Sequence, residues 1–169
     1  MATTAKLYSY DYRTAKTYMF ATAFIAGNLV LPQLAHLVPN GGLMFLPIYF
    51  FTLIAAYKYG IRVGLLTAVL SPLINTLLFG MPEMAVVPVI IAKSAMLAVA
   101  AGWIAKKTGV ISLLNLVIVV LAYQVAGSSI EWISLGNFGA ALQDFRIGFP
   151  GMLLQIFGGY LLLKSISKI

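Results

Sequence analysis

Residues 84–105 read MAVVPVIIAKSAMLAVAAGWIA and are followed at once by Lys106 and Lys107. The stretch contains one charged side chain, Lys93. A helix needs about 20 consecutive apolar residues to cross the ~30 Å hydrocarbon core of a bilayer, so this stretch is long enough to span a membrane. A pair of lysines directly after an apolar stretch is typical of the cytoplasmic end of such a span.

The chain as a whole is too apolar for a soluble protein. Of its 169 residues, 62% are hydrophobic and 9% are charged, and the mean hydropathy is +0.99. Soluble domains carry about 25% charged residues, which help to cover a surface exposed to water. The composition therefore excludes an aqueous globular protein and indicates a protein of the bilayer.

Several classes of chemistry are excluded by what the sequence lacks. It has no cysteine, which rules out disulfides and thiolate sites, and its single histidine, His36, excludes a histidine-rich metal centre. The net charge of +7 comes from basic residues scattered in ones and twos, which does not favour nucleic acid as a partner. Because the sequence also has no G-x-S-x-G or G-x-x-x-x-G-K-[ST] motif, we expect neither an enzyme nor a cofactor.

Six apolar stretches of about the right length divide the chain. They are residues 16–38, 41–57, 62–79, 84–105, 110–130 and 147–163. Turn-forming residues at 39–42 and 80–83 separate some of them, and the residues left over are too few for a second domain. The sequence therefore predicts one all-α integral membrane domain over residues 1–169 with six transmembrane helices.

Basic residues predict the orientation of these spans. With the N-terminus in the cytoplasm, nine basic residues fall on the cytoplasmic side: Lys6, Arg13, Lys16, Lys58, Arg62, Lys106, Lys107, Lys164 and Lys168. Arg146 alone falls outside. Since cytoplasmic loops carry the excess of lysine and arginine, this bias places both termini of a six-span protein in the cytoplasm.

Polar side chains concentrate in the outer half of the predicted bundle. The candidate substrate-binding residues are His36, Asn75, Glu83, Lys93, Gln124, Glu131, Trp132, Asn137, Asp144 and Gln155. Polar groups within a membrane face the bundle interior or a water-filled cavity, because an unpaired polar group is costly in hydrocarbon. We therefore expect a pocket that opens outward, and the less polar inner half argues against a standing channel.

Two questions about this pocket stay open at the level of sequence. Lys93 either contacts a ligand or serves as a structural partner of Glu83 or Glu131. A lysine suits a carboxylate or phosphate ligand, whereas the two glutamates together with Trp132 suit a cationic heteroaromatic one. Three aromatic residues near predicted span ends are expected in the interfacial aromatic belt: Tyr57, Tyr123 and Trp132.

The first predicted span offers a second candidate surface. Its small residues at helical spacing are Thr22, Ala23, Ala26 and Gly27. Pairs of small residues four apart let two membrane helices approach closely. This face therefore either docks a partner subunit or packs internally against the second or sixth span.

Four short stretches resemble the substrate-binding subunit, or S-component, of energy-coupling-factor (ECF) vitamin transporters. They are Tyr57–Gly64 (YKYGIRVG), Ser71–Asn75 (SPLIN), Phe79–Pro82 (FGMP) and Gly148–Met152 (GFPGM). Taken with the six predicted spans, the small size and the absence of cysteine, the similarity covers about residues 15–165.

The resemblance implies a fold of six helices that binds a vitamin or related micronutrient near its extracellular face. The pocket would be formed by helices four to six and capped by the loops after spans one, three and five. The resemblance also implies a transmembrane coupling subunit and two cytoplasmic ATPases as partners, in a bacterial cytoplasmic membrane. The alternative function is a self-sufficient small secondary transporter or channel, with Lys93 and the carboxylates as a proton or ion relay.

Topology provides the first test. Because the chain has no cysteine of its own, Lys107→Cys and Asn137→Cys each introduce a single thiol. A membrane-impermeant maleimide should label the Asn137→Cys variant in intact cells, and the Lys107→Cys variant only after the membrane is opened. Labelling of both from one side would contradict the six-span arrangement, since the two loops would then share a compartment.

Overall fold

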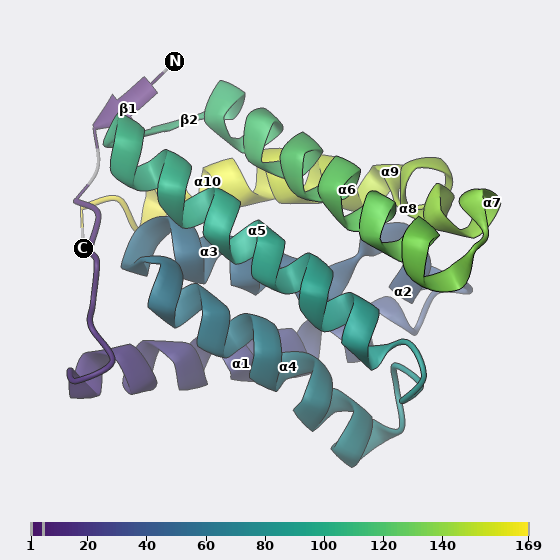
Figure 1. The fold of residues 1–169 in the computed structure, drawn as a ribbon. Coiled ribbons are helices and arrows are strands. Elements are labelled where there is room, and N and C mark those ends of the chain that lie inside the picture. The colour runs from purple at the N-terminus through teal and green to yellow at the C-terminus, as the bar shows by residue number, and fades with distance from the viewer. Residues whose placement is uncertain (1, 5, 169) are drawn as a thin grey trace.

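The computed structural model describes residues 2–4 and 6–168 and is built almost wholly from helices (Figure 1). Five helical segments are long and apolar enough to cross a membrane. They are Ala15–Ala35 (α1), Gly41–Tyr59, Ile61–Phe79 (α4), Val87–Thr108 (α5) and Leu113–Ser134, which lies within α6 (Leu113–Leu135). The predicted all-α architecture is therefore confirmed, and the chain is compatible with a multi-pass membrane protein.

Shorter elements complete the fold. The segment Gly41–Tyr59 consists of α2 (Gly41–Phe45), the 3-10 turn η1 (Pro47–Tyr49) and α3 (Phe50–Tyr59). The strands β1 (Ala2–Thr4) and β2 (Val110–Ser112) pair antiparallel, with Thr3 opposite Ile111. Two short helices, α7 (Phe138–Ala141) and α8 (Gln143–Arg146), form the connection that follows α6.

The C-terminal part departs from the expected single helix over residues 147–163. Three consecutive segments take its place: α9 (Phe149–Leu153), the π-helical turn η2 (Leu154–Gly158) and α10 (Gly159–Ser165). Together they are shorter than any of the five membrane-length segments, so a sixth crossing stays a prediction. Single π-helical turns inside helices are rare and occur frequently at functional sites.

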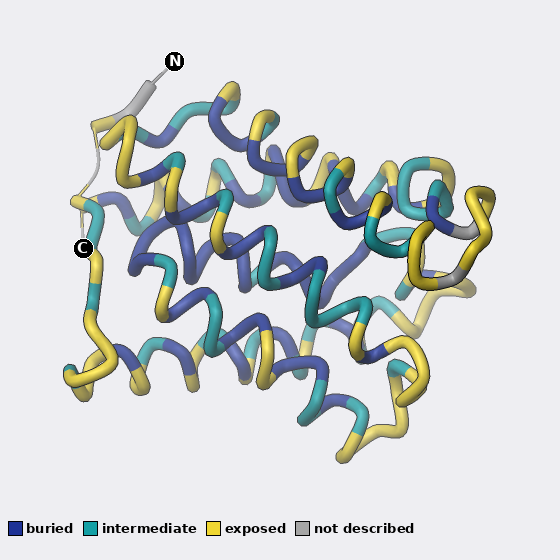
Figure 2. The backbone as a smooth tube through the Cα atoms, in the orientation of Figure 1, coloured by how far each residue is buried: buried dark blue, intermediate teal, exposed yellow. Residues whose placement is uncertain are grey.

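The helix α3 lies at the centre of the bundle. Its residues 52–59 are all buried, and α1, α4, α5 and α10 pack around it (Figure 2). Gly64 lets α4 approach α3, because a Cβ atom at this position would lie only 2.4 Å from the Cβ of Ala56. Small residues at such crossings allow the close backbone contact on which membrane helices depend.

The outer surface of the bundle is apolar. Its most exposed large side chains include Leu77 (75% exposed), Leu114 (67%), Ile133 (81%) and Leu161 (63%), which come from three elements, α4, α6 and α10. A water-soluble monomer rarely exposes apolar surface on so many sides. This surface fits contact with lipid chains.

One buried amide ties three helices together. Asn28 of α1 donates to Thr52 Oγ1 of α3 at 3.1 Å and to Ser71 Oγ of α4 at 3.2 Å. Its Oδ1 accepts from the backbone N–H of Phe51 at 3.2 Å, and its backbone carbonyl accepts from Asn75 Nδ2 at 2.8 Å. A buried network in which these groups satisfy one another fixes how α1 lies against α3 and α4.

The elements that carry the nine predicted cytoplasmic basic residues meet at one end of the bundle, which we call the basic end (Figure 1). Lys58 is fully buried there. Its Nζ donates to the backbone carbonyls of Lys6 at 2.6 Å and Ser167 at 3.4 Å. Lys58 therefore joins the N-terminal and C-terminal segments of the chain and is not a solvated anchor.

Tyr57 corrects a second expectation at the basic end. It is 1% exposed and therefore does not belong to an interfacial aromatic belt. Its hydroxyl donates to the Val110 carbonyl at 2.7 Å and accepts from Asn115 Nδ2 at 3.0 Å, and Asn115 also donates to Thr108 Oγ1 at 3.0 Å. The half of the bundle near the basic end thus contains a polar network whose groups satisfy one another. The sequence, which predicts a less polar inner half, does not predict this network.

The Asn28 network generates a stability test. Asn28→Leu keeps the volume of the side chain but removes the partner of Thr52, Ser71 and the Phe51 N–H. We expect the variant to lose about 2–4 kcal/mol of unfolding free energy, because buried groups are left unsatisfied. Thermal unfolding in detergent measures the loss, with Thr22→Val on the exposed face of the same helix as the control. Equal melting temperatures for wild type and Asn28→Leu would show that the network does not hold α1.

Candidate functional site

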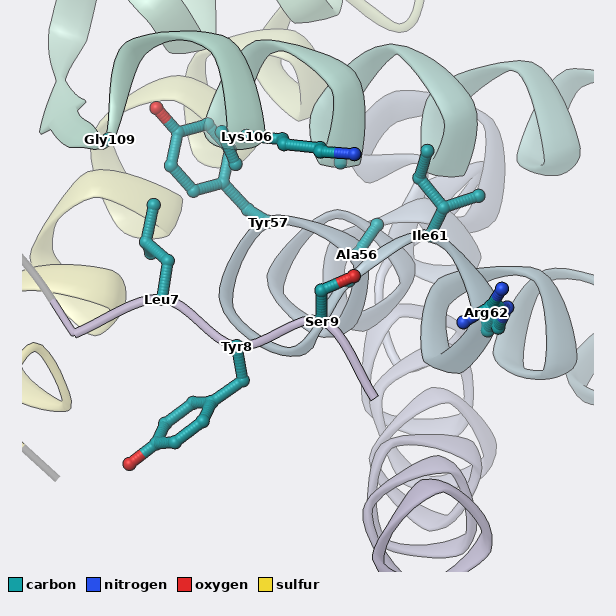
Figure 3. A pocket seen from close by; sticks show the side chains of 12 residues that line it. Leu7, Tyr8, Ser9, Ala56, Tyr57, Ile61, Arg62, Lys106 and Gly109 are labelled. Carbon is teal, nitrogen blue, oxygen red and sulfur yellow. The ribbon is translucent and has the colours of Figure 1, made fainter. Parts of the chain in front are cut away.

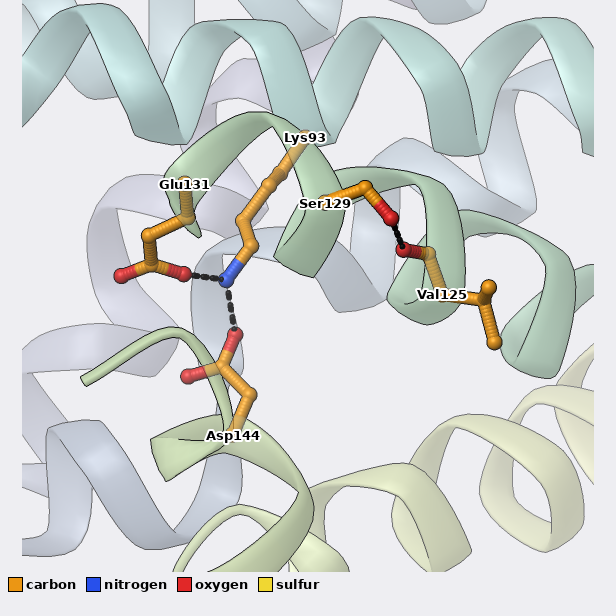
Figure 4. Close-up of polar contacts among 5 residues, drawn as sticks. All are labelled: Lys93, Val125, Ser129, Glu131 and Asp144. Carbon is orange, nitrogen blue, oxygen red and sulfur yellow. Dashed lines mark hydrogen bonds and ion pairs between the residues drawn. The ribbon is translucent and has the colours of Figure 1, made fainter. Parts of the chain in front are cut away.

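The end of the bundle opposite the basic end carries Glu83, Glu131 and Asp144, and we call it the acidic end. Two of these carboxylates meet Lys93 of α5 (Figure 4). Lys93 Nζ donates to the Glu131 carboxylate at the end of α6 and to Asp144 Oδ2 of α8, the latter at 2.8 Å. These three residues, the charge cluster, connect three elements that are far apart in the sequence.

Two glycines bring the members of the charge cluster together. A Cβ atom at Gly127 would lie 2.7 Å from Lys93 Cγ, so the aliphatic part of Lys93 runs directly over the backbone of α6. Gly136 ends α6 with φ at +64°, a left-handed conformation that suits glycine. The chain turns back after Gly136, and α8 then places Asp144 against Lys93.

The ammonium group of the charge cluster is more buried than its partners. The side chain of Lys93 is 3% exposed, whereas those of Glu131 and Asp144 are 19% and 14% exposed. Lys93 thus has Glu131 as a structural partner, as one of the two sequence interpretations proposed, while Glu83 is not its partner. Across the described residues 2–4 and 6–168, no three His, Cys, Asp or Glu side chains are grouped to hold a metal ion.

A second polar pair lies between α6 and η2, about two helical turns from Glu131. Tyr123 donates to Gln155 Oε1 at 2.9 Å, and its ring centre lies 5.5 Å from that of Tyr49 in η1. Tyr123 is 1% exposed, so the expected place in an aromatic belt is wrong for this residue too. Tyr49, 4% exposed, was missed at the sequence level because no periodicity places the short turn η1 beside α6.

Several buried polar atoms here have no hydrogen-bond partner within the described part of the chain. They are the amide oxygen and nitrogen of Gln124, the hydroxyls of Ser94 and Ser128, and Nε2 of Gln155. Gln124, Ser128 and Glu131 lie on one face of α6, because they are spaced by four and three residues. Leaving a buried polar group unsatisfied costs about 1–3 kcal/mol, so such a row indicates a place where a ligand or water completes the hydrogen bonding. Ser128 could have been found from sequence as the residue one turn after Gln124.

Three other predicted residues, His36, Asn75 and Glu83, line a cavity of about 460 Å³ at the acidic end. Most of its remaining walls are apolar, and they include Pro32, Leu43, Pro47, Ile48, Met81, Pro82, Val86 and Ile90. Asn75 is 1% exposed, and its Oδ1 has no hydrogen-bond partner among the described residues. This volume, with apolar walls and a few polar groups, is typical of a small-molecule site.

The cavity at the acidic end and the charge cluster lie close together along α5. Ile48 lines the cavity, and the next residue, Tyr49, packs against Tyr123. Ile90 of α5 lines the cavity as well, and Lys93 lies about one turn further along the same helix. The two groups of residues are therefore neighbouring parts of one region.

Eight of the ten predicted site residues belong to this region. The charge cluster and the polar side chains near it account for Lys93, Gln124, Glu131, Asp144 and Gln155, and the cavity accounts for His36, Asn75 and Glu83. Trp132 is 50% exposed and packs edge-on against Phe138, as expected of an interfacial aromatic. Asn137 is exposed in the turn between α6 and α7.

The small residues of α1 do not share one surface. Thr22, Ala23 and Ala26 are exposed, whereas Gly27 is half-buried. A Cβ atom at Gly27 would lie 2.7 Å from the ring of Phe51 in α3, so Gly27 serves internal packing. Of the four, Thr22, Ala23 and Ala26 are exposed on α1, and whether they dock a partner stays a prediction.

A second cavity of about 460 Å³ lies at the basic end (Figure 3). The N-terminal residues 7–9 form one side of it, and Tyr57, Arg62 and Lys106 contribute to the others. The sequence did not predict this cavity, because the N-terminal segment reaches it only through the tertiary fold.

The charge cluster generates a test of its structural role. Lys93→Met should lower the unfolding free energy by about 3–5 kcal/mol, because Glu131 and Asp144 lose their buried counter-charge. Adding Glu131→Gln and Asp144→Asn to the same chain should restore most of the loss. The exposed Lys164→Met is the control, and thermal unfolding in detergent is the measurement. A Lys93→Met protein as stable as the control would mean that the carboxylates need no counter-charge.

Comparisons with known proteins identify no relative of this chain. No family model, no curated protein and no solved structure matches it. What the protein does is therefore inferred from its own residues.

Proposed function

We propose that this protein is a membrane-embedded substrate-binding subunit of the ECF type, which captures a vitamin or related micronutrient at its acidic end. The observation that carries the proposal is the combination of the charge cluster with the unpartnered polar atoms of Gln124, Ser128 and Gln155. Groups of this kind are costly inside an apolar bundle and mark functional sites there by default. The resemblance of the sequence to S-components supplies the function class.

The placement of charge supports capture from outside the cell. Nine basic residues lie on elements that meet at the basic end, which the positive-inside rule assigns to the cytoplasm. The candidate site lies at the opposite end, next to a cavity of about 460 Å³. On this orientation, the cavity is the route by which a ligand reaches the buried polar groups from the extracellular side.

The proposed partners are a transmembrane coupling subunit and a pair of cytoplasmic ATPases. The chain has no phosphate-binding loop of the G-x-x-x-x-G-K-[ST] type, so the energy for uptake comes from other chains. The exposed face of α1 with Thr22, Ala23 and Ala26 is the proposed docking surface for the coupling subunit. Side chains this small let the backbones of two helices come close together.

The cavity at the basic end favours a second candidate function. With cavities at both ends and a buried charge cluster that joins α5, α6 and α8, the chain could act alone as a secondary transporter, in which the cluster relays protons or ions. Native mass spectrometry of the purified protein identifies the small molecule that it carries from cells. If vesicles containing only this chain accumulate that molecule under a proton gradient, the self-sufficient transporter replaces the ECF-type subunit.

The docking surface can be tested separately from the site. Ala23→Leu and Ala26→Leu should abolish ATP-driven uptake by the assembled transporter and leave binding of the co-purified molecule unchanged, because a bulky side chain holds the helices apart. Ala122→Leu, at an exposed position of α6, is the matched control and should transport normally. Normal uptake by both α1 variants would place the partner on another face.

A further inference from the structure

We propose that the charge cluster recognises a small organic cation, such as a protonated amine or a cationic heteroaromatic ring, and not a carboxylate or phosphate. The inference rests on the proposed function, since it names the class of ligand that the same site takes. It decides between the two ligand charges that the sequence leaves open.

The charges of the cluster do not balance. Two carboxylates, Glu131 and Asp144, share one ammonium group, that of Lys93. When all three are ionised, the cluster carries one negative charge in excess. Buried charges are retained where they are paired, so the cluster is complete only when another cation joins it.

The carboxylates of the cluster are more accessible to a ligand than its ammonium group is. Lys93 is 3% exposed, and the two carboxylates bonded to it are 19% and 14% exposed. One oxygen of each carboxylate contacts Lys93, and the other oxygen points away from it (Figure 4). A ligand that approaches the cluster therefore meets carboxylate oxygens first, and an anion would be repelled before it reached the ammonium group.

Buried polar side chains with unpartnered atoms lie about two helical turns along α6 from Glu131. Gln124 and Gln155 are 0% exposed, and each has an atom without a hydrogen-bond partner within the described part of the chain. These amides are independent of the charge count and offer hydrogen bonds to the neutral parts of a ligand. The rings of Tyr49 and Tyr123, whose centres lie 5.5 Å apart, supply aromatic surface at the same level of the bundle, and aromatic faces attract organic cations.

The surroundings of the site are negatively charged, like the charge cluster itself. The adjoining cavity is lined by Glu83 and contains no lysine or arginine among its described walls. Apart from Lys93, the basic residue expected at this end is Arg146, which is exposed. The approach to the site is therefore acidic, in contrast to the basic end.

Single neutralisation of the carboxylates tests the charge count without knowledge of the ligand. Asp144→Asn and Glu131→Gln each leave a neutral pair with Lys93, so neither variant should melt below wild type, and at least one should melt about 2–4 °C higher. Lys93→Met should melt lower than both. If both single variants melt as low as Lys93→Met, both carboxylates are needed to hold the lysine and the inference is overturned.

Three small molecules of similar shape but different charge test directly which sign of ligand charge the site prefers. Choline is a cation, 3,3-dimethylbutanol is its neutral counterpart and 3,3-dimethylbutanoate is the anion. At millimolar concentration choline should raise the melting temperature of the wild type more than the other two, and this difference should disappear in Asp144→Asn. A larger rise with the anion overturns the inference. If no probe raises the melting temperature, the melting temperatures of Asp144→Asn and Glu131→Gln decide whether the inference stands.

Failure of the inference and failure of the proposed function give different results. One outcome is that native mass spectrometry identifies an anionic molecule, which the assembled transporter takes up with ATP. That result would overturn the inference of a cationic ligand and leave the proposed function in place. If the protein prefers choline and the chain alone carries out uptake, the inference of a cationic ligand stands and the proposed ECF-type function is overturned.

Discussion

The requirement that a charged group inside an apolar bundle be paired governs the acidic end of this protein. Lys93 sits within a helix that is otherwise apolar over the length of a membrane crossing. Its ammonium group is paired with Glu131 of α6, which approaches closely at Gly127, and with Asp144 of α8, which returns over it. The connection after α6 is thus held in place by the same contacts that keep the lysine charged, and stability and candidate function share one set of residues.

The same requirement explains the other polar side chains of the interior. Asn28 with Thr52 and Ser71 joins α1, α3 and α4, and Lys58 joins the two terminal segments at the basic end. These groups are satisfied by the protein itself and need no ligand. Gln124, Ser128 and Gln155 differ, because they keep unpartnered atoms among the described residues. This difference separates polar groups that hold the fold from those that are candidates for binding.

The short turn η1 and the π-helical turn η2 position residues of the proposed site. η1 contributes Pro47 and Ile48 to the wall of the cavity and Tyr49 to the contact with Tyr123, and η2 presents Gln155 to Tyr123. Neither element is a regular helix, and each displaces side chains from the positions that a 3.6-residue period would give them. A substrate-binding subunit needs a shaped site inside a bundle of plain helices, and these two turns are where the proposed site acquires its shape.

The sequence by itself determined the all-α class of the protein, five of its six predicted segments of membrane length and the end of the bundle that carries the candidate site. These properties depend on composition and on residue order along single helices, which hydropathy and charge report directly. It identified Lys93 and Glu131 but not Asp144 as the second partner, it misplaced Tyr57 and Tyr123, and it left open whether Gly27 packs internally. Pairing, burial and the irregular form of the last helical segment were decided by the tertiary structure alone, because they depend on which helix faces come together across long sequence separations.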